Sequence, residues 1–198
     1  MKKIFTILCI GLFTIGTTSA QSGFTLTGGI NLANVVSDDY EPDMKVGFRI
    51  GGVGSLPLSD YVSLRGGVLY STKGCVIPDQ VELYDTFGNF IGYTDLTINL
   101  SYIEAPFGIE FSANDMISFH AGIYSAFLVG DKSEAGGISG SADAESVDMG
   151  LDFGATFSVN DALSINAGYQ YGFTEVFENS EAYNRSIVIA MGYTFGGY

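Results

Sequence analysis

Large apolar residues alternate with small or polar residues, with a period of two, along nearly the whole chain after Gln21. Over residues 187–195, for example, every odd position carries a large apolar side chain. No stretch after Gln21 shows a convincing period of 3.6, which a helix with one buried face requires. Successive side chains of a β-strand point to opposite faces, so the pattern predicts strands with one apolar face and one small or polar face.

Eight segments carry this alternation, and many are longer than the roughly 5–6 residues usual for strands of soluble proteins. Their length suits strands that cross a membrane, which need about 9–11 residues, with extensions beyond the bilayer. The segments are 24–32, 46–56, 61–76, 94–111, 116–130, 146–158, 162–175 and 185–196.

An internal repeat supports this division, because three segments begin with one pattern that starts at Asp60, Asp115 and Asp161. The pattern reads Asp, any residue, apolar, Ser, apolar, any residue, Gly or Ala, Gly, apolar, and Phe24–Ile30 repeats its strand part. We interpret it as shared strand geometry rather than a ligand-binding motif. Its second glycine falls on the polar face, where we expect it to leave room for a large neighbour. These glycines are Gly29, Gly67, Gly122 and Gly168.

Short and long connections alternate between the segments. The short ones lie around 58–60, 112–115 and 160–161 and carry Asn or Asp, as tight hairpins require. Short turns on one side and long loops on the other are typical of an outer-membrane barrel, and an even strand count predicts that both termini are periplasmic. The long, polar connections are 33–45, 77–93, 131–145 and 176–184.

The alternation alone does not decide whether the apolar face points inward or outward. An apolar interior predicts a soluble, exported, lipocalin-like carrier of a small apolar ligand, whereas an apolar exterior predicts a membrane barrel. Mean hydropathy is +0.27 despite a net charge of −14, and few Lys or Arg are available for a soluble surface. These features favour an all-β fold, an eight-stranded antiparallel up-and-down transmembrane β-barrel of OmpA or OmpX size, with residues 21–198 as one domain.

With the apolar set outward, most charges within the segments face the lumen. The apolar parity changes along segment 94–111, and a β-bulge near Tyr102-Ile103 would repair it and turn Glu104 and Glu110 inward. Eight strands enclose only enough room for side chains, so we expect a salt-bridged plug, with a narrow channel as the alternative. The expected lumen charge network is Arg49, Arg65, Lys73, Glu104, Glu110, Asp148, Asp152 and His120.

Residues 1–20 have the pattern of a cleaved signal peptide. Lys2 and Lys3 precede an apolar stretch over residues 4–15, and Thr18-Ser19-Ala20 supplies the small residues of a cleavage site. Cleavage after Ala20 leaves one cysteine, Cys75, which we expect to be a small apolar filler. The sequence therefore predicts export, and the barrel pattern predicts residence in the outer membrane of a Gram-negative cell.

Several stretches resemble the outer-membrane β-barrel family of Bacteroidetes that includes PorT-like proteins. They are Gly47-Phe-Arg-Ile-Gly-Gly-Val, Leu56-Pro-Leu-Ser-Asp-Tyr-Val-Ser-Leu, Val68-Leu-Tyr-Ser-Thr-Lys-Gly74, Leu100-Ser-Tyr-Ile-Glu-Ala-Pro-Phe107, Ala121-Gly-Ile-Tyr and Asn184-Arg-Ser-Ile. The resemblance covers essentially the whole mature chain and implies the fold and the location. PorT-like members are associated with a system that secretes proteins across the outer membrane, so the resemblance also implies an export-accessory role.

The chemistry-bearing residues indicate a non-enzymatic protein. The one histidine, His120, has no nucleophile motif around it, and no phosphate loop or EF-hand is present, so we expect no catalytic residue, no cofactor and no metal site. The net charge of −14 excludes a nucleic-acid binder that works by phosphate neutralisation. A structural, surface-interaction or export-accessory role remains.

The partners expected from the sequence are outer-membrane lipid and lipopolysaccharide, and the barrel-assembly machinery, which would recognise the aromatic end of the chain with Tyr193, Phe195 and Tyr198. Acidic residues in or beside the long connections suggest contacts with surface proteins or divalent cations, although acidic loops also simply stay solvated. Fifteen of the 22 acidic residues lie there: Asp38, Asp39, Glu41, Asp43, Asp79, Glu82, Asp85, Asp95, Asp131, Glu134, Asp143, Glu145, Glu175, Glu178 and Glu181.

Overall fold

A computed structural model describes residues 23–37, 42–84, 86–178 and 180–195 of the chain. The expected signal peptide and the terminal Tyr198 lie outside the described residues. Within the described ranges no helix is long and apolar enough to cross a membrane. The strands are β1 (Gly23–Val36), β2 (Asp43–Pro57), β3 (Val62–Tyr84), β4 (Phe90–Ser112), β5 (Ile117–Ala135), β6 (Ile138–Gly140), β7 (Val147–Ser158), β8 (Leu163–Glu175) and β9 (Tyr183–Phe195).

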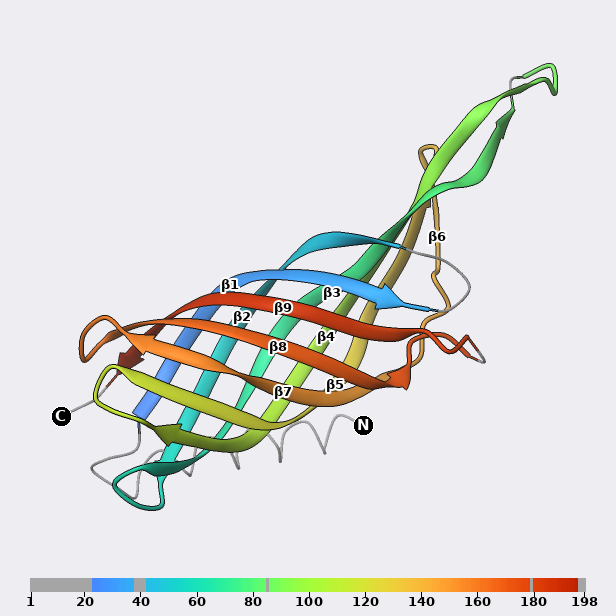
Figure 1. Cartoon of the computed structure of the whole chain (residues 1–198). Helices are drawn as coiled ribbons and strands as arrows, with labels where there is room; N and C mark the ends of the chain where they lie inside the picture. Colours follow the sequence, from blue (N-terminus) through green and yellow to red (C-terminus); the bar gives the residue numbers. More distant parts are fainter. Residues whose placement is uncertain (1–22, 38–41, 85, 179, 196–198) are drawn as a thin grey trace.

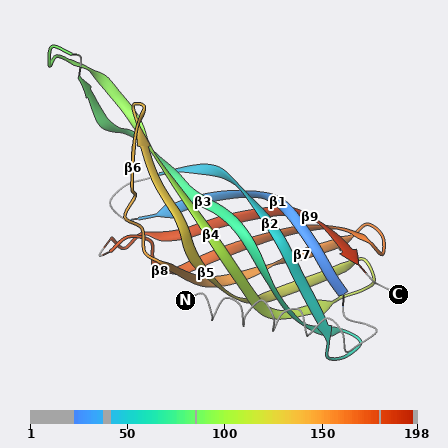
Figure 2. The ribbon, with the colours of Figure 1, turned by 180° about the vertical axis from the view of Figure 1, so that it is seen from behind.

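Eight of these strands form a closed antiparallel ring. Each pairs with its neighbour in sequence, β5 pairs with β7, and β1 pairs with β9 from Phe24↔Phe195 to Val36↔Tyr183, which closes the barrel. The short strand β6 only adds to the end of β5. Figures 1 and 2 show the strands tilted around one axis. The ring confirms the predicted eight-stranded antiparallel up-and-down barrel.

The three short turns are built alike and lie at one end of the barrel, which we call the short-turn end. In the turn between β4 and β5, the Asn114 side-chain oxygen accepts hydrogen bonds from the amides of Met116 and Ile117, both at 2.9 Å. Asn160 does the same between β7 and β8, and Ser59 is the equivalent between β2 and β3. Asn and Ser cap turns in this way, so the sequence repeat starts where the hairpins reverse.

The opposite end, which we call the long-hairpin end, is more ordered than the sequence pattern predicts. Residues 77–93 were expected to be a loop, but β3 and β4 stay paired from Val81↔Thr94 to Tyr84↔Phe90. Residues 131–145 likewise include the β5–β6 pairing, such as Glu134↔Ser139. Figure 1 shows the β3–β4 hairpin projecting well past the other strands, beside β6. The loop prediction is wrong here because polar residues also form strands when their backbones pair outside an apolar layer.

Strand β4 shows that the barrel changes polarity along its axis. From Leu96 to Glu110 its even-numbered side chains point inward: Ile98, Leu100 and Tyr102 are buried, and so is Glu104. The outward side chains change in the opposite sense, from Thr97, Asn99 and Ser101 to Ile103, Ala105, Phe107, Ile109 and Phe111. We call the part with apolar outward residues (103–111 of β4) the belt zone. We call the part with apolar inward residues (96–102 of β4), together with the hairpins beyond it, the hairpin zone.

The expected β-bulge in segment 94–111 is therefore wrong as a cause of the parity change. The inward parity never switches in β4, and Glu104 points inward without it. A register slip does occur at Ser101/Tyr102, where the partners are Gly130 and Leu128, so the extra residue is Val129 of β5. At this level the apolar side chains of β4 change from the inner face to the outer face of the barrel, because the surroundings of the barrel change.

The repeated glycines allow close approach of neighbouring backbones rather than room for a large side chain. A Cβ at Gly122 would lie 2.3 Å from the carbonyl oxygen of Phe107 and 2.5 Å from the Cα of Gly108 on β4. At Gly29 it would lie 2.1 Å from the carbonyl oxygen of Ile189 on β9. The expectation of a bulky neighbour is wrong, because the atoms that exclude a side chain belong to the adjoining strand.

Candidate functional site

A buried ionic cluster fills the middle of the lumen. Lys73 Nζ lies 2.9 Å from Glu104 Oε1 and 3.2 Å from Asp148 Oδ2, and Arg49 Nη2 lies 3.3 Å from Glu104 Oε2. These four residues, which we call the lumen cluster, come from β2, β3, β4 and β7 and are all buried. The strands thus cross-link through side chains as well as through backbone pairing.

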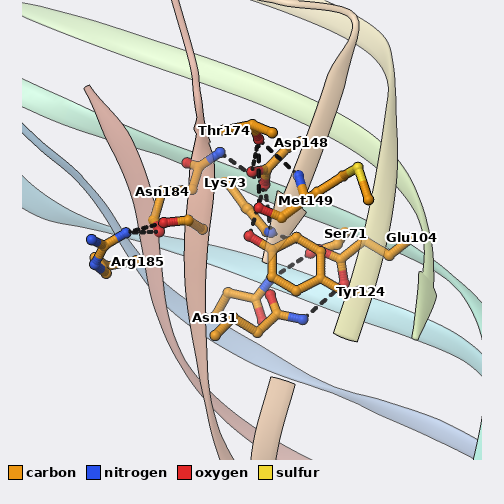
Figure 3. Close-up of polar contacts among 12 residues, drawn as sticks. Asn31, Ser71, Lys73, Glu104, Tyr124, Asp148, Met149, Thr174, Asn184 and Arg185 are labelled. Carbon is orange, nitrogen blue, oxygen red and sulfur yellow. Dashed lines mark hydrogen bonds and ion pairs between the residues drawn. The ribbon is translucent and has the colours of Figure 1, made fainter. Parts of the chain in front are cut away.

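Neutral polar groups complete the shell of the lumen cluster (Figure 3). The Tyr124 hydroxyl donates to Asp148 Oδ2 at 3.1 Å, Asn184 Nδ2 donates to the same oxygen at 3.0 Å, and Thr174 donates to Oδ1 at 3.3 Å. The Tyr124 ring also lies 4.3 Å from Lys73 Nζ. Buried charges that are paired and hydrogen-bonded on several sides hold a fixed geometry.

A second polar contact, between His120 and Asp152, lies beside the lumen cluster. His120 Nε2 is 3.7 Å from Asp152 Oδ2, and Gln170 Nε2 donates to Asp152 at 3.3 Å and to Glu104 at 3.4 Å. Gln170 therefore joins the two groups into one network across the lumen. The other ring nitrogen of His120, Nδ1, has no hydrogen-bond partner among the described residues.

Arg65 and Glu110 are inward as expected, but within the described residues they form no ion pair. Both line a polar cavity of about 210 Å³ at the short-turn end. A cavity of this size holds several waters, which hydrate polar groups that lack a direct partner. The other lining residues are mostly hydroxyl and amide side chains: Thr25, Thr27, Ser55, Ser118, Thr156, Ser158, Ser164, Asn166 and Thr194.

An apolar core closes the hairpin zone above the lumen cluster. Val176 and Ala182, from the connection between β8 and β9, are buried against inward side chains such as Leu100. Ala144 and Phe177 pack against the same core and form a β-bridge with each other. Cys75 lies within this core, which confirms the expected apolar filler. The lumen is thus filled by charges in its middle and by apolar side chains at its long-hairpin end.

The outer wall of the belt zone is apolar on every side. About half of the surface of Phe48 on β2, Ile109 on β4 and Ile189 on β9 is exposed, and large apolar side chains line the other strands of the ring in the same way. Tyr193 and Phe195 stand outward at the short-turn end, with ring centroids 4.8 Å apart. A soluble barrel would place its charges on this wall, so the lipocalin-like arrangement is not favoured.

The hairpin zone presents acidic and aromatic groups. Asp131 holds the connection after β6, because its carboxylate accepts hydrogen bonds from the Ser141 hydroxyl at 2.7 Å and from the amides of Ala142 and Asp143 at 3.0 Å. Those bonds lower the pKa of Asp131 below its ordinary value. No group of three or more His, Cys, Asp or Glu able to hold a metal occurs in the described ranges.

The sequence located the eight expected network residues on the inner face, and the structure joins six of them, leaving Arg65 and Glu110 at the cavity. It missed the neutral partners, above all Tyr124, Thr174 and Asn184. Their parity gave the signal: Tyr124 lies four residues after His120 on β5 and therefore shares its inward face.

A closed ring of eight strands with an apolar outer belt and a charged, filled lumen defines an outer-membrane β-barrel. The family model described as "Outer membrane protein beta-barrel domain" matches residues 19–178. The chain therefore belongs to this family. None of the curated proteins matches the chain in sequence.

Two solved structures share the fold at low sequence identity. The attachment invasion locus protein Ail of Yersinia pestis is 17% identical, with a TM-score of 0.51 over 88% of this chain and 99% of that chain. Neisserial surface protein A is 15% identical, with a TM-score of 0.55 over 89% of this chain and 98% of that chain. At these identities the likeness concerns the fold alone.

Proposed function

We propose that this protein is a non-enzymatic, non-conducting outer-membrane barrel that acts through the surface of its long-hairpin end. In this proposal the long-hairpin end faces the outside of the cell, and the short turns and both termini face the periplasm. The observation that carries it is the division of the barrel: its inner charges neutralise one another in a filled lumen, whereas its projecting hairpins carry exposed side chains.

The chemistry of the hairpins favours cationic or neutral partners. Tyr84, Phe90 and Tyr93 stand exposed near the tip of the β3–β4 hairpin, with Tyr84 and Phe90 at 6.0 Å between ring centroids. Carboxylates such as Asp95 and Glu134 surround its base. The Ail neighbour was solved with the heparin analogue sucrose octasulfate. An acidic surface repels such a polyanion, so we infer a different class of partner here.

An export-accessory role of the PorT-like kind is the second candidate, and it rests on the resemblance of the Tyr70–Gly74 and Tyr102–Pro106 motifs. Lys73 and Glu104 from these motifs form the 2.9 Å ion pair of the lumen cluster. The two motifs therefore help to fill the lumen, so an export role would depend on the projecting hairpins instead. Deleting the gene and measuring surface and secreted proteins tests it: unchanged secretion contradicts an export role.

The two ends of the chain are expected to act during export and assembly. We infer cleavage of residues 1–20 and recognition of the aromatic C-terminal end by the barrel-assembly machinery. N-terminal sequencing of the mature protein should begin at Gln21. Removal of residues 193–198 should abolish assembly into the outer membrane, and normal assembly of that truncated chain would contradict a C-terminal signal.

Cysteine labelling on intact cells tests the orientation. In a Cys75→Ser background, Phe87→Cys at the hairpin tip should react with a membrane-impermeant maleimide, because Phe87 is 89% exposed. Ser59→Cys in a short turn should react only after the outer membrane is permeabilised. The reverse pattern would contradict the proposed topology.

Planar-bilayer recording tests the filled lumen. The refolded barrel should show no steady conductance, because the lumen cluster and the apolar core above it block the path. Discrete, reproducible channel openings would favour the narrow-channel alternative instead.

A further inference from the structure

Arg185 is the one described Arg or Lys that stands on the outer wall beside the apolar belt. Arg49, Arg65 and Lys73 face the lumen, and Lys132 pairs with Glu134 in the β5–β6 region. Lys45 on β2 is partly buried and lies opposite the buried Ala33 of β1, so it shares the inward face. Arg185 on β9 alternates with the inward Asn184 and Ser186, so it shares its outward face with Ile187 and Ile189. Figure 3 shows it pointing away from the lumen cluster.

The Arg185 guanidinium is held in place on this wall. Its carbon lies 3.6 Å from the ring centroid of Tyr171, its register partner on β8, and 5.9 Å from that of Tyr183. Nη1 donates to the carbonyl oxygens of Gly172 at 2.6 Å and Asn184 at 2.9 Å. No described carboxylate lies within ion-pair distance of it. The fixed cation therefore keeps Nε and Nη2 as donors for a ligand.

The depth of Arg185 matches the edge of a bilayer. From Phe195 at the short-turn end, β9 runs ten residues to Arg185. That length is about 34 Å along the strand, and about 24 Å along the membrane normal at a tilt of about 45°. The apolar band of such barrels is about 25 Å tall and is bordered by aromatic rings. Tyr171 and Tyr183 around Arg185 have the position of that border.

We propose that Arg185, stacked on Tyr171, binds the phosphate of a lipid headgroup in the leaflet at the long-hairpin end. A guanidinium offers parallel N–H donors that match a phosphate, and the edge of the apolar belt is the level at which lipid phosphates lie. Under the proposed orientation, on which the identity of the leaflet rests, that lipid is lipopolysaccharide and the group is a lipid A phosphate.

Native mass spectrometry of the full mature chain in detergent tests the site. The probes are diphosphorylated lipid A, the same lipid A with its phosphates removed, phosphatidylglycerol, and inorganic phosphate as a competitor. Arg185→Gln should weaken binding of phosphorylated lipid A about tenfold, the effect expected for lost hydrogen bonds to a charged group. Its binding of dephosphorylated lipid A should equal that of the unmodified chain.

Three further variants separate the site from general charge and from folding. Tyr171→Leu keeps the wall apolar and should weaken binding about threefold by removing the stacked ring. Lys132→Gln removes an equal charge elsewhere and should leave binding unchanged. Glu175→Gln, on the same wall, should leave binding unchanged or tighten it. A band shift on unboiled gels shows for each variant that the barrel has formed.

Each result of the lipid-binding experiment either supports the Arg185 site or overturns it. An equal loss for phosphatidylglycerol supports a site for any lipid phosphate, and a loss for lipid A alone supports the lipopolysaccharide site. Unchanged affinity of a folded Arg185→Gln, an equal loss with Glu175→Gln or Lys132→Gln, or full displacement by millimolar inorganic phosphate would overturn the proposal. Failure of the proposed orientation would show independently, as cysteine labelling from the wrong side.

Discussion

The belt zone and the hairpin zone are parts of the same strands with opposite polarity. On β4, the belt zone turns Phe107 and Ile109 outward and Glu104 inward, whereas the hairpin zone turns Asn99 outward and Leu100 inward. Strand β3 makes the same change, with Lys73 inward at the boundary and Cys75 and Ile77 inward beyond it. The same strands thus lie in lipid at the belt zone and in water at the hairpin zone.

The two zones are stabilised by different interactions. In the hairpin zone apolar side chains are removed from water, which is the usual driving force of a soluble core. In the belt zone most apolar side chains face lipid, so the inward contacts come mainly from ion pairs and hydrogen bonds, with a few buried apolar side chains such as Leu69. Changes that are equivalent in sequence should therefore act differently in the two zones.

The largest expected effect is that of Lys73→Met. The substitution keeps the volume but leaves Glu104 and Asp148 buried without their shared cation, which costs about 3–5 kcal/mol in comparable pairs. Lys132→Met breaks the exposed pair with Glu134 and should cost at most about 1 kcal/mol. Urea unfolding from lipid vesicles measures both. Equal losses would show that the lumen cluster adds nothing beyond a surface pair.

The next effect tests the apolar core of the hairpin zone. Leu100→Ala should cost about 2–5 kcal/mol, because Leu100 is fully buried in protein and its loss leaves a cavity. Ile109→Ala on the lipid-facing wall should cost clearly less, since lipid chains fill the space that the side chain vacates. The same unfolding experiment compares them. A larger loss for Ile109→Ala would contradict the assignment of the two zones.

A smaller effect concerns the close strand contact in the belt zone. Gly122→Ala places a Cβ 2.5 Å from the Cα of Gly108 and should cost about 1–3 kcal/mol, the usual range for overpacking. Gly130→Ala on the same strand meets only the Ser101 side chain, with Cβ at 3.7 Å and Oγ at 3.9 Å, and should change stability by less than about 0.5 kcal/mol. Tolerance of alanine at Gly122 would show that β4 and β5 separate easily.

The smallest effect is a local pH dependence in the hairpin zone. The lowered pKa of Asp131 means that its carboxylate stabilises the 141–143 turn at pH values above about 3.9, the ordinary Asp value, and that this stabilisation is lost as pH falls through the lowered pKa. The amides of Ala142 and Asp143 should lose protection from hydrogen exchange in that range. Asp131→Asn should reduce their protection already at neutral pH. Protection that is unchanged by both acid and Asp131→Asn would remove the role of this carboxylate.

The sequence predicted the ring and the inner face well, because alternation fixes both strand identity and side-chain direction. The eight segments match the eight ring strands closely, and the charges from Arg49 to Asp152 are inward. The prediction from the sequence failed beyond the boundary where the surroundings of the barrel change from lipid to water. The change of apolar parity in segment 94–111 indicated a bulge only under the assumption of one environment, and polar strands beyond the belt, such as those around Glu82, carry no apolar alternation to mark them.

Spin-label accessibility along the outward face of β4 would show where the surroundings of the barrel change from lipid to water. Single cysteines at positions 95, 97, 99, 101, 103, 105, 107 and 109, in a Cys75→Ser background, would carry a nitroxide in the reconstituted barrel. Collisions with apolar oxygen should dominate from position 103 onward, and collisions with a water-soluble nickel complex should dominate up to position 101. A profile without a switch between 101 and 103 would contradict a barrel that changes polarity at the lumen cluster.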